Sequence, residues 1–213
     1  INSGAITTLN TNYTLLSQRQ FERKMRNPLH GRARARFVSA TNTTMELGFI
    51  TTTGATAQVN GAYWQYTPSG VMQPVVTFNS NDVTGSNIAS SLVNTQYYQW
   101  DVIIDDDSAI FICQNTATQA IVSEQTIPLP VSATKQFSQT HLNFGARVFI
   151  TTAAGSAPAL YLTEAVVGYM DTSGSMLKPW PHVAGEWKPA VWSPTLPTTT
   201  AVSWANSAEP ASA

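Results

Sequence analysis

The carboxylates of this sequence are the residues that could support catalysis or bind a metal. Asp105 and Asp107 have the two-residue spacing that places acids on one face of a strand, and a glycosidase needs two carboxylates about 5–10 Å apart. Yet they flank Asp106 at a predicted turn, where aspartates are favoured and strand pairing is not. Glu46 has no acidic neighbour in its predicted strand, and the aspartates lack the ligand spacing of a calcium loop. The acids therefore predict a solvated turn, with no metal site and no enzyme activity.

The remaining residues that could do chemistry are isolated in the sequence. His30, His141 and His182 show no i, i+4 pairing and lie near no pair of cysteines, so neither a zinc site nor a histidine-based triad is predicted. No glycine-rich phosphate loop is present, and we expect no cofactor. Cys113 is the single cysteine, which excludes a disulfide within the chain, and its apolar neighbours predict a buried side chain.

Basic residues are concentrated in one short stretch near the start of the sequence. Seven of the eleven lie between positions 19 and 36. They are Arg19, Arg23, Lys24, Arg26, Arg32, Arg34 and Arg36. In the segment GRARARFVS, Gly31–Ser39, arginine alternates with apolar residues, which places Arg32, Arg34 and Arg36 on one face of a strand.

Two interpretations of this arginine band remain open. Arginines on an edge strand can simply block aggregation, or they can contact an acidic protein surface such as a capsid shell. Nucleic acid and membrane partners are not expected, because the net charge is only −1. A nucleic-acid site would also have several aromatic residues among the basic ones, and this band has only Phe21. The candidate partner-binding residues of the band are Arg19, Arg23, Arg26, Arg32, Arg34 and Arg36.

Six aromatic residues could instead form a platform on which a sugar stacks. They are Tyr63, Trp64, Tyr66, Tyr97, Tyr98 and Trp100. The even-numbered four share one strand parity, and aromatics dominate sheet cores, so the pattern favours a core position for them. Tyr63 and Tyr97 have the opposite parity and are the better surface candidates.

The end of the sequence has an unusual composition. Residues 179–213 hold six of the twelve prolines and four of the six tryptophans. The prolines exclude a long helix or an interior strand, whereas a disordered tail would not normally carry so many tryptophans. We therefore predict an extended arm whose indoles anchor it to this domain, to a neighbouring copy or to another protein. Its candidate partner-binding residues are Trp180, Trp187, Trp192 and Trp204.

The segment Tyr97–Asn115, YYQWDVIIDDDSAIFICQN, predicts the central element of the fold. Aromatic and branched residues alternate with polar ones up to Ile104, which is typical of a strand buried on one face. After the three aspartates, Ala109–Cys113 is apolar on both parities, as in a strand buried on both faces. A hairpin of this kind needs a second sheet packed over it.

Further strands are predicted on both sides of this hairpin. Only 11% of the residues are charged, and the scarcity of the helix formers Glu, Lys and Arg favours strands over helices. The main ones are Thr43–Thr52, Gly61–Thr67, Val71–Asn79, Ile121–Glu124, Ala146–Thr152 and Leu160–Met170. About nine short strands at this spacing, separated by turn residues, predict an all-β, antiparallel two-sheet sandwich or jelly roll.

The order of motifs resembles a known group of proteins. A basic strand is followed by ELGF (Glu46–Phe49), NGAYW (Asn60–Trp64), YYQWDVIIDDDSAIFIC (Tyr97–Cys113) and IPLP (Ile127–Pro130). Over about residues 30–170 this resembles the concanavalin A-like jelly rolls of virion structural proteins in tailed bacteriophages. The resemblance implies a jelly-roll sandwich at 30–171, between an N-terminal arm at 1–29 and the C-terminal arm at 172–213.

The same resemblance implies a role on the virion surface. It suggests a capsid decoration (cement) protein that binds the major capsid protein or other virion proteins, stabilises the shell through its arms, and forms a dimer or trimer. The alternative is a carbohydrate-binding jelly-roll module of a phage tail or fibre, with a glycan as its ligand.

Overall fold

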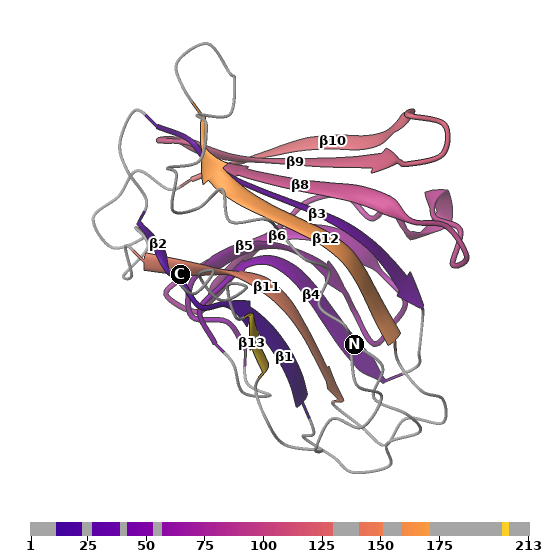
Figure 1. The fold of residues 1–213 in the computed structure, drawn as a ribbon, viewed down its shortest axis with the longest axis horizontal. Coiled ribbons are helices and arrows are strands. Elements are labelled where there is room, and N and C mark those ends of the chain that lie inside the picture. Colours follow the sequence, from indigo (N-terminus) through magenta and orange to yellow (C-terminus); the bar gives the residue numbers. More distant parts are fainter. Residues whose placement is uncertain are drawn as a thin grey trace, which may run out of the picture.

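The computed structural model describes residues 12–22, 27–38, 42–52, 57–129, 141–150 and 159–170, together with the backbone of 202–204. These residues form two stacked and curved sheets (Figure 1). The large sheet contains β1 (Asn12–Ser17), β2 (Phe21–Glu22), β4 (Thr43–Ile50), β5 (Gly61–Tyr66), β6 (Met72–Phe78), β7 (Asn81–Thr84), β11 (His141–Ile150) and β13 (Val202–Trp204). The small sheet contains β3 (Leu29–Val38), β8 (Tyr98–Ile104), β9 (Ser108–Asn115), β10 (Ile121–Pro128) and β12 (Ala159–Tyr169).

The predicted all-β sandwich is therefore confirmed. The large sheet runs β13-β1-β11-β4-β5-β6-β7, with β2 paired beside β11, and the small sheet runs β10-β9-β8-β3-β12. The chain crosses between the sheets several times, as Figure 1 shows, and neighbouring strands are antiparallel except for β1 and β13. A single short 3₁₀ turn, Ala89–Ser91, is the only helical element of the described segments, and none of these could cross a membrane as a helix.

The central hairpin forms as predicted, but β9 is fully buried on one face only, because Ile110 and Ile112 on its outer face are half-buried. β8 and β9 pair in register from Tyr98 with Asn115 to Ile104 with Ala109. The aspartates form the turn, which is closed by a 2.8 Å hydrogen bond from the Asp105 N–H to the Ser108 carbonyl. The hairpin lies in the middle of the small sheet, so one face of it contacts the large sheet.

Aromatic side chains fill the space between the two sheets. The ring centroid of Trp100 lies 5.2 Å from that of Trp64 and 5.1 Å from that of Phe37, in edge-to-face arrangements. Phe111 extends the cluster, with its centroid 5.6 Å from that of Trp64. Such pairs add to the apolar burial that drives sheet stacking, at about 0.5–1.5 kcal/mol each. The core position predicted for Trp64 and Trp100 is therefore correct.

The first described residues and the C-terminal strand belong to the large sheet. Asn12–Ser17 lie in the stretch predicted as an N-terminal arm, yet they form β1, which is antiparallel to β11. Val202–Trp204, in the predicted C-terminal arm, pair in parallel with Leu15–Ser17. The residue pattern along the sequence did not predict these two strands, because both are short and are stabilised by pairing with a neighbouring strand. Residues 1–11 and 171–201 lie outside the described part of the chain.

Candidate functional site: an arginine–tyrosine surface

Strand β3 places its arginines on the outer face of the small sheet. The alternation predicted from the sequence holds, because Ala33 and Ala35 are completely buried between the sheets while Arg34 is exposed on the other side. Strand β3 lies between β8 and β12, so it is an interior strand. Edge protection, one of the two interpretations left open by the sequence, therefore does not explain these arginines.

Two tyrosines flank the outer arginine of this row. The guanidinium carbon of Arg36 lies 4.3 Å from the ring centroid of Tyr161 on β12 and 5.4 Å from that of Tyr97, which directly precedes β8. The guanidinium carbon of Arg34 lies 5.9 Å from the Tyr97 ring. Cations at this distance over an aromatic face are attracted by about 0.5–1 kcal/mol at exposed sites. We call these four residues, Arg34, Arg36, Tyr97 and Tyr161, the arginine–tyrosine surface.

The third arginine of the row, Arg32, forms an ion pair inside the protein. Arg32 Nε donates a 2.7 Å hydrogen bond to Oδ1 of buried Asp101, which also contacts His30 Nε2 at 2.5 Å. Gln99 donates to the second oxygen of Asp101 at 2.8 Å. Burial alone would raise the pKa of Asp101, but the hydrogen bonds from His30, Arg32 and Gln99 and the charge of Arg32 outweigh it and hold this pKa below its ordinary value. Asp101 thus neutralises Arg32 and leaves Arg34 and Arg36 to face solvent.

The other predicted partner-binding residues are distributed differently. Arg19 is exposed between β1 and β2, strands of the large sheet, and so is not part of this surface. Trp204 belongs to β13 by its backbone. Arg23, Arg26, Trp180, Trp187 and Trp192 lie outside the described residues.

Sequence reasoning identified part of this surface and missed part of it. Tyr97 is half-buried on the outer face, as its parity predicts. Tyr63 is buried instead, because it packs in a cluster with Ile50 and Val75. Tyr161 was missed, since no local signal connects it with Arg36, which is far away in sequence. Only the pairing of β12 with β3, which places Tyr161 directly beside Arg36, would have identified it.

A second polar cluster lies on the outer face of the large sheet. Glu46 Oε2 contacts Arg147 Nη2 at 2.7 Å and accepts a 2.8 Å hydrogen bond from Gln58. Gln65 donates to the other oxygen at 3.4 Å. Glu46 and Arg147 are almost fully buried. This arrangement connects β4, β5 and β11, so we assign Glu46 a structural role.

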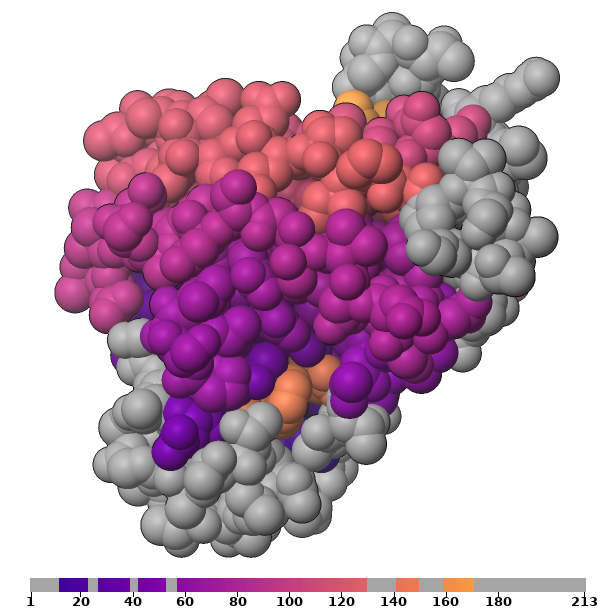
Figure 2. Space-filling view, turned by 180° about the vertical axis from the view of Figure 1, so that it is seen from behind, coloured from indigo at the N-terminus to yellow at the C-terminus, as the bar shows by residue number. Residues whose placement is uncertain are grey.

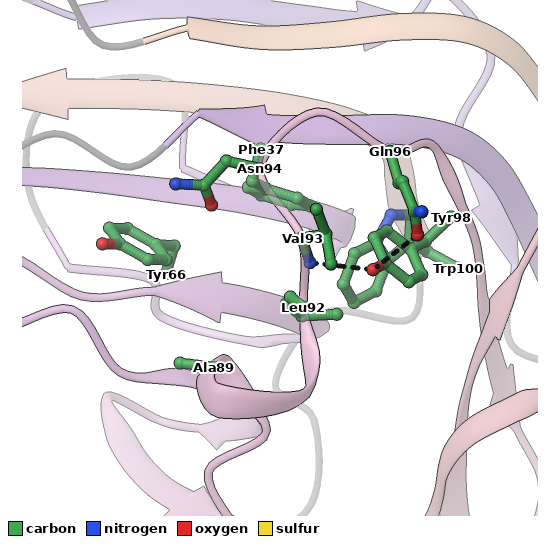
Figure 3. Close-up of a pocket in the computed structure, with 9 residues that line it drawn as sticks. All are labelled: Phe37, Tyr66, Ala89, Leu92, Val93, Asn94, Gln96, Tyr98 and Trp100. Atoms are coloured by element: carbon green, nitrogen blue, oxygen red, sulfur yellow. Dashed lines mark hydrogen bonds between the residues drawn. The ribbon is translucent and has the colours of Figure 1, made fainter.

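A small hollow opens at one end of the sandwich, beside the 89–97 connection (Figure 3). Phe37 and Trp100 line it from the core side, and the Tyr98 hydroxyl accepts a 2.8 Å hydrogen bond from the Val93 N–H across it. The hollow accommodates little more than a water-sized group, so it does not fit a sugar ring or a drug-sized ligand.

The acidic turn uses its aspartates in local hydrogen bonds. The Asp106 N–H donates a 2.8 Å hydrogen bond to Oδ1 of Asp105, which is an ordinary use of aspartate in a turn. Within the described ranges, no three histidine, cysteine or acidic side chains lie close enough to hold a metal ion. In the view from behind, strand β10 borders the 79–97 segment (Figure 2). The two are joined by a 2.6 Å hydrogen bond from the Ser86 N–H to Gln125 Oε1.

Comparison with known proteins extends the description of the fold. No protein-family model and no curated protein matches the sequence. An uncharacterized protein from Mycobacterium paratuberculosis has a similar structure, with a TM-score of 0.51 at 9% identity over 71% of this chain and 72% of that one. Scytalido-glutamic peptidase gives 0.45 at 13% identity, over 79% and 83%. The CBM2 module of the evolved Dit protein of Lactobacillus casei BL23 phage J-1 gives 0.43 at 9%, over 67% of each chain.

The prediction that this chain is not an enzyme is corrected by these comparisons. Most of the similar structures are enzymes, among them the glutamic peptidases, a xylan beta-1,4-xylosidase from Bacillus halodurans and an alginate lyase from Klebsiella pneumoniae. The prediction relied on the absence of paired acids along the sequence, whereas a sheet can bring together side chains that are far apart in sequence. At identities of 7–13% and TM-scores of 0.44–0.45, these likenesses assign no activity to this chain.

Proposed function

We propose that this chain is a virion structural protein, a capsid decoration protein that docks onto an acidic protein surface through the arginine–tyrosine surface. The observation that carries the proposal is the position of Arg36, which is stacked between Tyr97 and Tyr161 on an interior strand. The virion assignment comes from the resemblance of residues 30–170 to phage jelly rolls. The tryptophans of the 179–213 segment supply further anchors under the same proposal.

The residue types of this surface favour a protein partner over a polyanion. Aromatic residues and arginine are the side chains that most often dominate protein interfaces. Stacking holds the guanidinium of Arg36 in place, so less rotamer freedom is lost when a carboxylate binds. The net charge of −1 gives little long-range attraction for a nucleic acid.

The test is co-sedimentation of the protein with shells assembled from the major capsid protein of the same virion. The double variant Arg34→Glu/Arg36→Glu should lose binding by at least about tenfold, since two attractions become repulsions. Arg19→Glu is the matched control, because it changes an exposed arginine outside this surface and should leave binding within about twofold. Unchanged binding of the double variant would rule out this docking surface.

A glycan is the second candidate ligand of the same surface. It is favoured by the half-buried rings of Tyr97 and Tyr161, because tyrosine rings on a sheet face can stack on sugars. A glycan array probed with the wild type and with Tyr97→Ala would detect this function. Binding that depends on Tyr97 would support the tail or fibre role over decoration.

A further inference from the structure

The arginine–tyrosine surface has a spacing that restricts its partner, and the inference drawn from it rests on the proposed function. We propose that the surface recognises an extended acidic protein segment in which two carboxylates lie two residues apart, one bound by Arg34 and the other by Arg36. The partner is thus defined by the pattern acid-x-acid in an extended conformation.

The two arginines are spaced along the strand in the same way as alternate residues of any extended segment. Arg34 and Arg36 share one face of β3, so their Cα atoms are separated by two strand rises, about 6.6 Å. Acidic side chains two residues apart in any extended segment have the same separation and also share one face. An acidic segment aligned along β3 therefore presents one carboxylate to each arginine, whereas adjacent acids would point to opposite sides.

Arg36 is held in a defined position by its neighbours. Its Nε is buried and donates no hydrogen bond to the described residues, while the rings of Tyr97 and Tyr161 flank the guanidinium. With Nε buried and the residue half-buried, the two terminal amino groups are the N–H donors that remain for a ligand. A carboxylate matches these two groups with two parallel hydrogen bonds, which adds directionality to the charge attraction.

The charges on the surrounding face also restrict the ligand. Arg32 is paired with Asp101, and Glu164 on β12, the register partner of Arg34, forms no ion pair within the described part of the chain. Glu124 is exposed on β10, at the far edge of the same sheet. A long polyanion lying across the sheet would meet both glutamates, whereas a short acidic strand along β3 meets both arginines and has only Glu164 beside it. This favours a peptide over a nucleic acid or an anionic polysaccharide.

The experiment compares two acetylated pentapeptides of identical composition and charge, TDTDT and TDDTT, each with the same fluorophore, by fluorescence anisotropy. The proposal expects TDTDT to bind at least about fivefold more tightly to the wild-type protein. Arg34→Gln and Arg36→Gln should each weaken TDTDT by about tenfold and remove the preference. Arg36→Lys should also lose the preference, because it keeps the charge and loses the planar fork.

Matched variants separate recognition from folding. Tyr161→Phe keeps the ring and should bind as the wild type does, Tyr161→Leu should weaken TDTDT several-fold, and Arg19→Gln should have no effect. Circular dichroism establishes that each variant is folded. Equal affinity for the two peptides would overturn the proposal, and so would displacement of TDTDT by dextran sulfate at lower concentration than by unlabelled peptide.

The two proposals fail separately. If the peptides are not discriminated but the double variant Arg34→Glu/Arg36→Glu loses shell binding, this inference is wrong and the decoration role stands. If the peptides are discriminated while shell binding is unaffected by the double variant, the acid-x-acid recognition stands and its partner is a different protein.

Discussion

Glu46 on β4 and Arg147 on β11 form a buried ion pair, with 2.7 Å between Oε2 and Nη2 and with 1% and 0% of the two residues exposed. They are direct register partners, so the pair spans the two central strands of the large sheet. Removing one member leaves the other charge in a site from which water is excluded. That cost usually exceeds what the intact pair contributes.

Glu46→Gln is therefore expected to lower the free energy of unfolding by about 3–5 kcal/mol. The measurement is urea denaturation followed by tryptophan fluorescence. The matched variant is Gln65→Leu, which removes one long hydrogen bond to the same carboxylate and should cost less than about 1.5 kcal/mol. Equal effects of the two substitutions would show that the Glu46 charge is not the stabilising feature.

The Asp101 carboxylate makes stability depend on acid pH. Its pKa is lower in the folded protein than in the unfolded chain, so its contribution is fully present above the unfolded pKa, about 3.9. This stability is lost as the pH falls from there through the folded pKa. The difference in unfolding free energy between the wild type and Asp101→Asn should accordingly be largest near neutral pH and shrink below about pH 4. Thermal unfolding at a series of pH values tests this, and a difference that grows in acid would contradict it.

Gly48 occupies a position that only glycine tolerates. Its φ is +149°, and a Cβ there would lie 2.6 Å from the Ala62 carbonyl oxygen and 2.7 Å from the Tyr63 Cα. Gly48→Ala should cost about 1–3 kcal/mol for the backbone conformation, with the crowding in addition. Gly70→Ala is the control, because Gly70 also has a positive φ, +81°, while the nearest atom to its Cβ is 3.5 Å away. The Gly48 variant should melt clearly below the Gly70 variant, and the reverse order would be inconsistent with crowding.

Buried Cys113 provides a probe of global opening. Burial raises the pKa of its thiol, so little reactive thiolate exists at neutral pH in the folded protein. Its reaction with a thiol reagent should be undetectable in the native protein and should rise in step with the fluorescence transition in urea. Rapid labelling without denaturant would show that the Trp64–Phe111 layer opens locally, independent of unfolding.

Strand periodicity was sufficient to predict the class of fold, because it is a local property. Tyr98, Trp100 and Val102 alternate with polar residues, and that parity alone predicts which side of β8 is buried. Pro74 lies on β6 just beyond the point where the β6–β7 ladder ends, at Val75–Thr84, so its missing N–H removes no ladder hydrogen bond to β7.

Features that depend on contacts between distant residues were not predictable in this way. The stacking of Arg36 on Tyr161 requires the register of β3 with β12, which no property of either segment specifies. The same holds for the burial of Tyr63: its parity places it on the outer face of the large sheet, where it packs with Ile50, Val75 and Leu16. The arginines were found because they alternate along one strand, whereas the tyrosines that fix their geometry are brought in by the fold.

The C-terminal segment is predicted to serve assembly rather than the stability of the sandwich. The buried apolar core of the described residues ends at Val167, so truncation after Met170 removes only strand β13 from the described fold. We expect the truncated protein to keep its β-type circular dichroism and to lose binding to capsid shells, together with the anchors Trp180, Trp187 and Trp192. The untruncated chain with these three tryptophans changed to alanine is the matched control, and it should lose binding to a similar extent while keeping β13. Unfolding of the truncated protein would instead make the segment part of the core, and intact shell binding by both variants would remove the tryptophans from the interface.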